Sequence, residues 1–330
     1  MTTLITGAAG FIGSQLARRL LARGDHIVGI DNLNDYYDVR LKRDRLADIA
    51  SARFTFLPVD FADAKALDAA LGTASFDRIV HLGAQPGVRY SLEKPRAYAE
   101  SNLVGHLNML EIARRRGCSH FVYASSSSVY GGNESLPFRV EDRVDHPFSL
   151  YAATKKADEL MSETYAHLYR LPATGLRFFT VYGPWGRPDM AVWLFTRAIL
   201  AGEPITVYNG GDMRRDFTFI DDIVSGVVAA HDNPPSDDGE VKPGGSRAPH
   251  RLYNIGNNRA EELGTLIALI EQACGREAIR DYKPMQPGDV PATYADIETT
   301  RRDLGFAPTT PIEVGVPRFV EWYKAYQARR

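Results

Sequence analysis

The chain has 330 residues, of which 44% are hydrophobic and 24% are charged, and its formal net charge is −2. These values are ordinary for a globular protein, and the length suits one large α/β domain with a smaller lobe. A net charge so close to zero does not indicate a nucleic-acid or membrane partner. No apolar stretch reaches the roughly 18 residues that a membrane-spanning helix requires.

The cysteines and histidines do not indicate a metal site. Cys118 and Cys274 lie far apart in the sequence, and no two histidines stand four residues apart. The N-terminus leads directly into a strand-like run, Leu4-Ile5, without the charged and apolar regions of a signal peptide. We therefore expect a reduced protein of the cytoplasm without a bound metal.

The first predicted unit is a strand over residues 2–6, a glycine turn and a helix over 14–22. The turn carries Gly7, Gly10 and Gly13. In this context glycines let the backbone approach a pyrophosphate, and the helix N-terminus offers free N–H groups. The spacing is Gly-x-x-Gly-x-x-Gly rather than Gly-x-Gly-x-x-Gly. A plain turn between strand and helix is the alternative.

The second predicted strand, residues 26–30, ends at Asp31. An acidic side chain at this place can accept hydrogen bonds from both hydroxyls of an adenosine ribose, and it would repel a 2′-phosphate. No arginine follows Asp31 directly, so the sequence favours NAD over NADP. A helical pattern is predicted from Asp35 to about Ala47.

Three further strands are predicted over 54–59, 78–82 and 121–124, with helices over 64–71 and 97–116 between them. This alternation predicts an α/β fold with a doubly wound parallel sheet of the Rossmann type. Ligands of such sheets bind at the carboxyl ends of the strands. Polar residues follow these ends, namely Asp31, Asp60, Gln85 and Ser125 to Ser128.

A tyrosine and a lysine stand four residues apart in a helix predicted over 151–169. They are Tyr151 and Lys155, and the spacing places both on one helical face. A nearby ammonium lowers the pKa of a tyrosine, so that Tyr151 can take or give a proton near neutral pH. For this pair alone, a surface tyrosine and a solvated lysine are the alternative.

After a strand predicted over 173–178 the sequence becomes rich in Pro and Gly. A helix is predicted over 192–201, a short strand over 205–208, a polar loop over 212–222 and a final helix over 311–328. The second half of the chain is therefore less regular than the first.

The domain organisation follows from this change. We place a NAD-binding Rossmann domain at 1–178, with 217–232 returning to it, and mainly a smaller α/β substrate-binding lobe at 179–330. Residues 233–250 are rich in Pro, Gly, Ser and Asp and are predicted to form the most mobile loop. Whether this loop closes over the site is left open.

Three features together resemble the extended short-chain dehydrogenase/reductase superfamily. They are the glycine fingerprint from Gly7 to Gly13, the serine-ended fifth strand, and the Tyr151-x-x-x-Lys155 pair. The resemblance covers essentially the whole chain. Within the superfamily the sequence is most similar to nucleotide-sugar epimerases, and in particular to UDP-glucuronate 4-epimerases. This closer likeness lies in segments 31–37, 84–91, 177–191 and 213–218.

The resemblance implies a tightly bound NAD that is regenerated in each cycle. Lys155 would hydrogen-bond the nicotinamide ribose, and Phe178 would pack on the nicotinamide. The implied cofactor-binding residues are Gly7, Gly10, Phe11, Ile12, Gly13, Asp31, Asn32, Asn34, Asp60, Phe61, Leu82, Ala84, Asn102, Ala124, Tyr151, Lys155, Phe178 and Val181.

The resemblance also implies 4-epimerisation of UDP-glucuronate to UDP-galacturonate through a 4-keto intermediate. Tyr151 would take the proton of the sugar 4-hydroxyl, and Lys155 would hold the tyrosine ionised. Ser126 or Ser128 would bridge the 4-oxygen and Tyr151, and the sequence does not decide between them. The 4-keto sugar would then turn over and be reduced on its other face.

The 4-keto intermediate of an acid sugar can lose carbon dioxide, so its carboxylate must be held. An arginine suits this role because its planar fork binds a carboxylate at two points. The implied sugar contacts are Thr180, Arg187 and the serine cluster, including Ser126 and Ser127, with Arg89 as a second cation and Gln85 near the sugar.

The nucleotide part of the substrate is placed by the same resemblance. Thr206 and Tyr208 would flank uracil, Arg215 would meet the diphosphate, and Asp289 would meet the uridine ribose. Gln286 stands where relatives that use UDP-galactose carry an arginine, which leaves a second phosphate contact in question.

Related reactions differ in the residues that follow the first serines. Dehydratases of the superfamily carry an Asp-Glu pair there, and UDP-glucuronate decarboxylases carry a Glu. This chain has only Ser125 to Ser128 and no acid. A UDP-glucose/UDP-galactose 4-epimerase is the remaining rival, although Thr180 and Trp185-Gly186-Arg187 favour the acid sugar.

A non-catalytic NAD-binding sensor on the same fold is the alternative from another class of protein. Such sensors typically lack the tyrosine, which is present here as Tyr151. The expected partners are a UDP-sugar and a second copy of the chain, with neither nucleic acid nor a membrane. The resemblance implies dimerisation through the helices at about 97–116 and 151–169.

Overall fold

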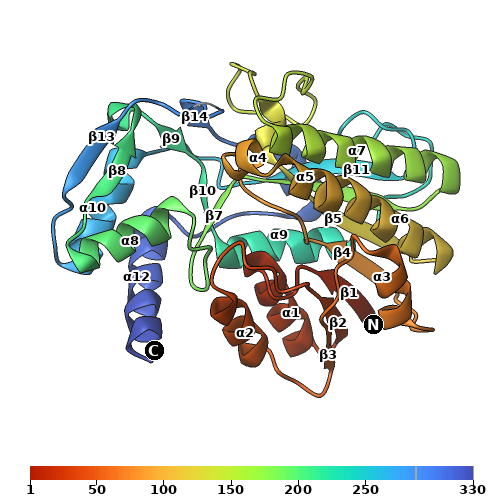
Figure 1. The fold of residues 1–330 in the computed structure, drawn as a ribbon. Coiled ribbons are helices and arrows are strands. Elements are labelled where there is room, and N and C mark those ends of the chain that lie inside the picture. Colours follow the sequence, from red (N-terminus) through yellow and green to blue (C-terminus); the bar gives the residue numbers. More distant parts are fainter. Residues whose placement is uncertain (287, 330) are drawn as a thin grey trace.

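The computed structural model describes residues 1–286 and 288–329. Seven parallel strands form its central sheet, in the order β11-β6-β5-β4-β1-β2-β3 (Figure 1). The strands are β1 (Thr2–Thr6), β2 (His26–Ile30), β3 (Phe54–Leu57), β4 (Arg78–His81), β5 (His120–Ser126), β6 (Ala173–Phe178) and β11 (His250–Ile255). The Rossmann-type doubly wound sheet predicted from the sequence is therefore confirmed.

Helices cover both faces of the sheet (Figure 1). One face carries α1 (Phe11–Arg23), α2 (Val39–Asp48) and α9 (Ile220–Asp232), and the other carries α3 (Ala64–Leu71), α6 (Gly105–Arg115) and α7 (Leu150–Tyr169). The strand order reverses between β1 and β4. In open α/β sheets a ligand binds in the crevice at this reversal, outside the carboxyl ends of the strands.

A second lobe lies on the left in Figure 1, and its strands form small sheets separate from the central one. Its helices α8, α10 and α12 pack on one another. Two small sheets accompany them, β8 with β13 and β12-β9-β14, and β7 pairs with β10. The bounds are β7 (Thr180–Tyr182), α8 (Ala191–Ala201), β8 (Ile205–Tyr208), β9 (Arg214–Arg215), β10 (Phe217–Phe219), β12 (Glu261–Glu262), α10 (Leu263–Cys274), β13 (Arg280–Lys283), β14 (Ala292–Thr293), α11 (Glu298–Leu304) and α12 (Ile312–Ala328).

The helix predicted from Asp35 begins later, at Val39. Side chains of the preceding segment bond to nearby backbone N–H groups instead of leaving them to a helix. Asp31 accepts from Leu33 N at 2.8 Å, and Asn32 accepts from Asn34 N at 3.1 Å. Such local bonds compete with helix formation, so this segment stays irregular beyond the carboxyl end of β2.

The helix predicted over 97–116 is confirmed up to Arg115, although its form changes along its length. It consists of α5 (Pro95–Tyr98), a π-helical turn (Ala99–Val104) and α6, and a short helix, α4 (Tyr90–Glu93), precedes it. π-helical turns are frequent at functional sites. This one carries Asn102, which is 1% exposed and bonds to Gln85 of the loop after β4.

The polar loop predicted over 212–222 is a partly wrong prediction, because it contains β9, β10 and the start of α9. Buried Asp216 organises it by accepting hydrogen bonds from the backbone N–H groups of Asn257, Asn258 and Ala295. The central sheet also includes β11, which lies beyond the boundary predicted at residue 178. The division into domains stays a prediction.

The 233–250 loop leads into the parallel strand β11. It therefore lies at the end of the sheet where the strands begin, which we call the amino edge; the end where the strands finish is the carboxyl edge. The loop is held against the end of α7: Arg170 donates to Asp237 at 2.7 Å, and Ser246 donates to Glu163 at 2.8 Å. The site described below is at the opposite edge. This placement argues against a lid.

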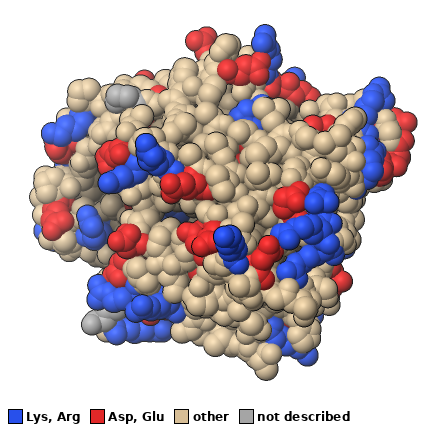
Figure 2. All heavy atoms as spheres, turned by 45° about the vertical axis from the view of Figure 1, so that its right-hand side comes forward, with Lys and Arg blue, Asp and Glu red and all other residues tan. Residues whose placement is uncertain are grey.

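The part of the chain that the structure describes contains no helix long and apolar enough to cross a membrane. Within the same residues, no three His, Cys, Asp or Glu side chains come together as a metal site would require. Figure 2 shows basic and acidic side chains interspersed over one face of the molecule, with uncharged surface between them.

Candidate active site

A cavity of about 850 Å³ lies at the carboxyl ends of the strands, between the central sheet and the second lobe. It brings together most of the residues predicted from the sequence. They are Gly7, Gly10, Phe11, Ile12, Gly13, Asp31, Asn32, Asn34, Phe61, Leu82, Ala84, Arg89, Ala124, Ser126, Ser127, Ser128, Tyr151, Lys155, Phe178, Thr180, Val181, Arg187, Thr206, Tyr208, Arg215 and Asp289.

The glycine turn has the shape that a dinucleotide requires. Gly7 has a φ of +67°, and a Cβ added there would lie 2.9 Å from the backbone N of Gly83. A Cβ on Gly13 would collide with the carbonyl oxygen of Gly7. Gly10 caps α1 without a side-chain hydrogen bond, which leaves the first N–H groups of the helix for an anion. These residues fit a pyrophosphate.

Beyond the glycine turn, the cavity is lined by Asp31 and by Lys42, a cation that was not predicted from the sequence. Lys42 of α2 places its Nζ 3.6 Å from Oδ1 of Asp31 and donates to Asn34 at 2.9 Å. Lys42 is buried, and burial lowers the pKa of its ammonium. A dinucleotide ribose placed here would meet both an acceptor and a donor.

Tyr151 and Lys155 lie on successive turns at the start of α7. The helix begins there because Ser149 accepts a hydrogen bond from Ala152 N at 3.1 Å. Lys155 is 2% exposed, and its Nζ donates to the carbonyl of Ala124 at 2.9 Å and to Asp158 at 3.0 Å. The lysine is thereby fixed between β5 and α7, with Tyr151 on the cavity wall.

The serines at the end of β5 divide into two roles. Ser125 points into the protein and donates to Glu159 at 2.7 Å. Ser126 donates to the hydroxyl of Ser128 at 3.2 Å and accepts from its backbone N–H at 3.1 Å. All four serines, Ser125 to Ser128, line the cavity, but the hydroxyl of Ser125 is bonded to Glu159 and anchors the cluster.

Glu159 is the acid nearest to the serines along these contacts, yet it is unavailable for proton transfer. It forms a two-point ion pair with Arg177 of β6, at 2.8 and 2.9 Å, and both side chains are at most 2% exposed. Burial opposes ionisation of Glu159, but Arg177 outweighs it and holds the pKa of this carboxyl below its usual value. Glu159 also does not line the cavity.

Arg187 lines the cavity and forms an ion pair with Asp189 of the same loop. Its Nε donates to Asp189 at 3.0 Å, its Nη2 donates to the other oxygen, and Tyr36 donates to the same carboxylate at 3.0 Å. Burial raises the pKa of Tyr36, so this phenol stays protonated. The Nε–Nη2 side of the guanidinium fork predicted for a substrate carboxylate is therefore occupied by Asp189, and Nη1 has no bond described to that carboxylate.

The second lobe and Arg89, from the loop between β4 and α4, line the other end of the cavity. Arg89 pairs with Asp289 at 3.0 Å and stacks over the ring of Tyr208, whose hydroxyl accepts from Gln286 at 2.8 Å. Arg215 lines the same region, and burial lowers its pKa. Arg89, predicted as a second cation for the sugar carboxylate, instead accompanies the residues predicted for the nucleotide.

Four predicted residues do not line the cavity: Asp60, Gln85, Asn102 and Gln286. The amide oxygen of Asn102 accepts from Gln85 N, and its amide nitrogen donates to Gln85 O and to the Thr154 hydroxyl, at 2.8 to 3.2 Å. Asp60 accepts from Ala62 N and Asn32. These side chains hold the loops that form the site, a role that strand-end position alone does not distinguish from contact with a ligand.

Sequence reasoning missed Tyr36, Lys42, Tyr98 and Asp189. Tyr98 is buried, and its ring lies edge-on to that of Tyr151 with 6.1 Å between the centroids. The Arg187-Pro188-Asp189 spacing could have indicated the ion pair. Nothing in the local sequence indicates that Lys42 reaches Asp31.

Comparisons with known proteins agree with this arrangement. The model of the NAD dependent epimerase/dehydratase family matches residues 3–256. Protein CapI of Staphylococcus aureus is 51% identical, covering 99% of both chains. A probable UDP-glucuronate 4-epimerase of Rhizobium meliloti (strain 1021) is 49% identical, covering 98% of this chain and 97% of that one.

Solved structures share the fold over the whole chain. The UDP-glucuronic acid 4-epimerase of Bacillus cereus, in complex with UDP-glucuronic acid and NAD, has a TM-score of 0.88 at 31% identity, covering 99% of this chain and 100% of that one. The UDP-glucose 4-epimerase of Thermotoga maritima, with UDP-glucose, has a TM-score of 0.87 at 27% identity, with the same coverage. The chain therefore belongs to the NAD dependent epimerase/dehydratase family.

Proposed function

We propose that the protein converts UDP-glucuronate to UDP-galacturonate by NAD-dependent epimerisation at C4, without decarboxylation. The observation that carries this proposal is one cavity that holds Tyr151, Lys155, the serine hydroxyls and Arg187 beside the glycine turn. The similarity to UDP-glucuronate 4-epimerases supports the same substrate.

The side chains of this chain carry the proton chemistry. Tyr151 takes the proton of the sugar 4-hydroxyl and returns it after the sugar has turned over. The ammonium of Lys155 favours the phenolate form of Tyr151. Ser126 or Ser128 hydrogen-bonds the 4-oxygen and keeps it in line with Tyr151. Bound NAD supplies the hydride acceptor for C4 and the hydride donor for the return step.

Arg187 provides the specificity for an acid sugar. In the 4-keto intermediate the carboxylate lies β to a carbonyl and is lost when its bond to C5 aligns with the carbonyl π system. The N–H groups of Arg187 that do not bond to Asp189, with Thr180 and Ser127, which also line the cavity, hold the carboxylate out of that alignment. Among the described residues, the acid that contacts the serines is Glu159, and its pairing with Arg177 keeps it from expelling water.

The second lobe, together with Arg89 from the loop between β4 and α4, binds the nucleotide in this proposal. Arg215 and Arg89 offer positive charge to the diphosphate, Asp289 accepts from the uridine ribose, and Thr206 and Tyr208 flank the uracil. All five line the cavity. Arg89 then supplies the second positive charge for the diphosphate, which the uncharged Gln286 cannot provide.

The test incubates the purified protein with NAD and each UDP-sugar and follows the products by chromatography. Interconversion of UDP-glucuronate and UDP-galacturonate without release of carbon dioxide is expected. Turnover of UDP-glucose in its place would make the protein a UDP-glucose 4-epimerase, an outcome for which the Thermotoga maritima structure is the precedent. Absence of any turnover would favour an NAD sensor.

We also propose a cytoplasmic homodimer. Apolar side chains are exposed along the predicted dimer helices, on α6 at Leu107 (41%) and on α7 at Leu160 (57%) and Leu168 (61%). Burying them against a second copy would remove this apolar surface from water. Both cysteines are free thiols, as in a reducing compartment. Light scattering of the purified protein tests the dimer.

A further inference from the structure

A buried polar cluster lies behind Lys155, and the chemistry proposed above gives it no role. Its centre is Asp158 of α7, which accepts from Lys155 at 3.0 Å. Beside it stands His106 of α6, whose Nε2 lies 2.9 Å from the hydroxyl of Ser162. Asp158, His106 and Ser162 are all fully buried, and none of them lines the cavity.

The cluster contains a gap between two proton-binding atoms. Oδ1 of Asp158 and Nδ1 of His106 face each other at 3.9 Å. Neither atom has a hydrogen-bond partner within the described residues. A buried polar atom without a partner costs free energy. When Asp158 carries a proton on Oδ1, that proton faces the acceptor Nδ1 of His106 across the gap.

The surroundings allow this proton to be lost near neutral pH. Burial raises the pKa of Asp158 to about 7, against the opposing charge of Lys155. Burial, with the charges of His81 and Lys155, lowers the pKa of His106 well below its usual value. The other ionisable groups that act on the pair are Glu159 of α7, Tyr123 of β5 and His250 of β11.

We infer that Asp158 and His106 form a buried acid–base pair that controls the charge beside Lys155 and, through Lys155, the proton affinity of Tyr151. While the gap holds its proton, Asp158 is neutral and the ammonium of Lys155 acts on Tyr151 in full. When the proton leaves to solvent, Asp158 becomes a carboxylate 3.0 Å from Lys155. The carboxylate offsets the ammonium, so the phenolate of Tyr151 becomes less favoured.

Both residues are positioning residues, because they act through Lys155 and touch neither cavity nor substrate. The inference rests on the proposed function only in the role of Tyr151. Its test therefore uses no sugar. The absorption of ionised tyrosine is followed against pH in the NAD-loaded protein, and Tyr151→Phe identifies the part of the signal that belongs to Tyr151.

Asp158→Asn is the main variant. The amide keeps the size of the side chain and an oxygen for Lys155, but it cannot ionise. We expect the midpoint of the Tyr151 signal to fall by about one pH unit, the size of effect that a nearby charge produces. An unchanged or raised midpoint overturns the inference, even if the protein epimerises UDP-glucuronate as proposed.

His106→Phe provides a second route should Asp158→Asn not fold. The ring fits a position that already packs edge-on to Phe121 and Tyr123. Asp158 would then face an apolar wall and stay protonated to higher pH, so the Tyr151 midpoint should fall by less than in Asp158→Asn. In the double variant His106→Phe should add no further shift, and an added shift would show that His106 does not act through Asp158.

Glu163→Gln is the matched control. Glu163 also lies on α7 and also pairs with a histidine, since its Oε2 lies 2.9 Å from Nδ1 of His250. It is farther along the helix from Lys155, and no contact joins it to that lysine among the bonds described above. The Tyr151 midpoint should move far less than in Asp158→Asn, because Glu163 reaches the pair only through His250. A shift equal to that of Asp158→Asn would assign the effect to general changes in α7.

Discussion

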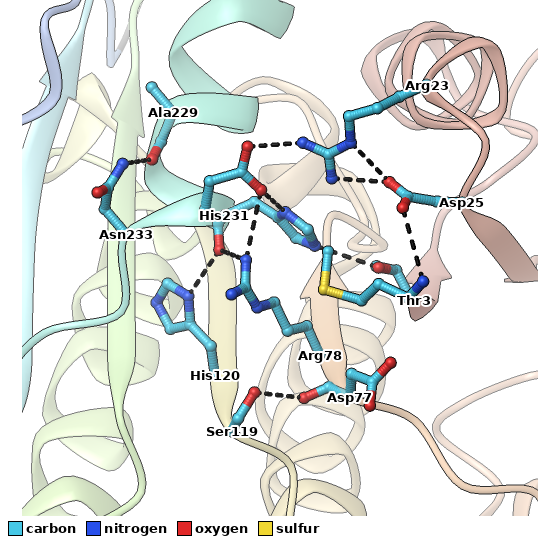
Figure 3. A network of polar contacts seen from close by, with 12 residues as sticks. Thr3, Arg23, Asp25, Asp77, Arg78, Ser119, His120, Ala229, His231 and Asn233 are labelled. Atoms are coloured by element: carbon cyan, nitrogen blue, oxygen red, sulfur yellow. Dashed lines mark hydrogen bonds and ion pairs between the residues drawn. The ribbon is translucent and has the colours of Figure 1, made fainter.

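Charged side chains lie at both ends of the strands of the central sheet, and the carboxyl ends open into the cavity described above. At the amino edge the charges pair with one another (Figure 3). Arg78 and His120 both donate to the carbonyl of His231, at 2.6 and 3.2 Å. The His231 ring lies 3.1 Å from the hydroxyl of Thr3 and 2.8 Å from Asp232. The network ties the end of α9 to strands β1, β4 and β5.

At the carboxyl ends of the strands, residues of the loops and of the second lobe together line a cavity. There Tyr151, Ser126 and Arg215 reach the cavity wall. The comparison shows that a cluster of polar residues does not by itself mark a site. A cluster whose members satisfy one another supports the fold, whereas a cluster that faces a cavity is free to bind and to react. Each of the following predictions tests this division.

Tyr151→Phe should produce the largest effect. Loss of the proton acceptor is expected to lower turnover by about 10³-fold, because general acid–base catalysis contributes on this scale. Bound NAD and the thermal midpoint should stay as in the wild type, since only a hydroxyl at the cavity wall is removed. Turnover kinetics, NAD content and calorimetry check the three quantities. Near-normal turnover would contradict the mechanism.

Arg187→Ala should discriminate between sugars. A charge-assisted contact contributes about 1.5–3 kcal/mol, so kcat/KM for UDP-glucuronate should fall about 10- to 100-fold. A neutral UDP-hexose should be affected far less. Arg143→Ala is the matched control, because Arg143 also pairs with an aspartate two residues on, Asp145, but is exposed. Equal losses for both sugars would remove Arg187 from carboxylate recognition.

His231→Leu should destabilise the protein without changing its chemistry. The substitution leaves the buried hydroxyl of Thr3 without its partner, at a cost of about 1–3 kcal/mol. Denaturant unfolding measures the loss, and kcat per folded molecule should not change. Ser119→Ala at the same edge is the control, because its hydroxyl bond to Asp77 is exposed. A lower kcat at unchanged stability would show that the two edges are coupled.

The pH dependence of stability should come in part from the amino edge. Burial lowers the pKa of His120 to about 3, from an ordinary value near 6.5. Between these values His120 binds a proton in the unfolded chain but not in the folded protein. The stability that the neutral His120 contributes is therefore fully present above pH 6.5 and is lost as the pH falls toward 3. His120→Gln should reduce this slope by at most about 1.4 kcal/mol per pH unit. Unfolding curves at pH 7, 6 and 5 test it, and an unchanged slope would contradict it.

Much of the fold could be predicted because its signals are local. The strand-turn-helix around Gly7 and the acid after β2 depend on neighbours in sequence, and so does the helical spacing of Tyr151 and Lys155. The π-helical turn around Asn102 could not be predicted, because it depends on bonds to Gln85 and Thr154 from other elements. Propensity alone reads that segment as one helix.

The candidate site shows the same division. Sequence alone determined the superfamily, the parallel sheet, and the residues that meet at the carboxyl edge, since backbone geometry places strand ends and helix faces. Tertiary structure decided which polar groups stay available. It pairs Glu159 with Arg177, Arg187 with Asp189, and Lys155 with Asp158. These pairs join different elements or depend on burial, and the proton affinity of a group is set by the charges and solvent around it.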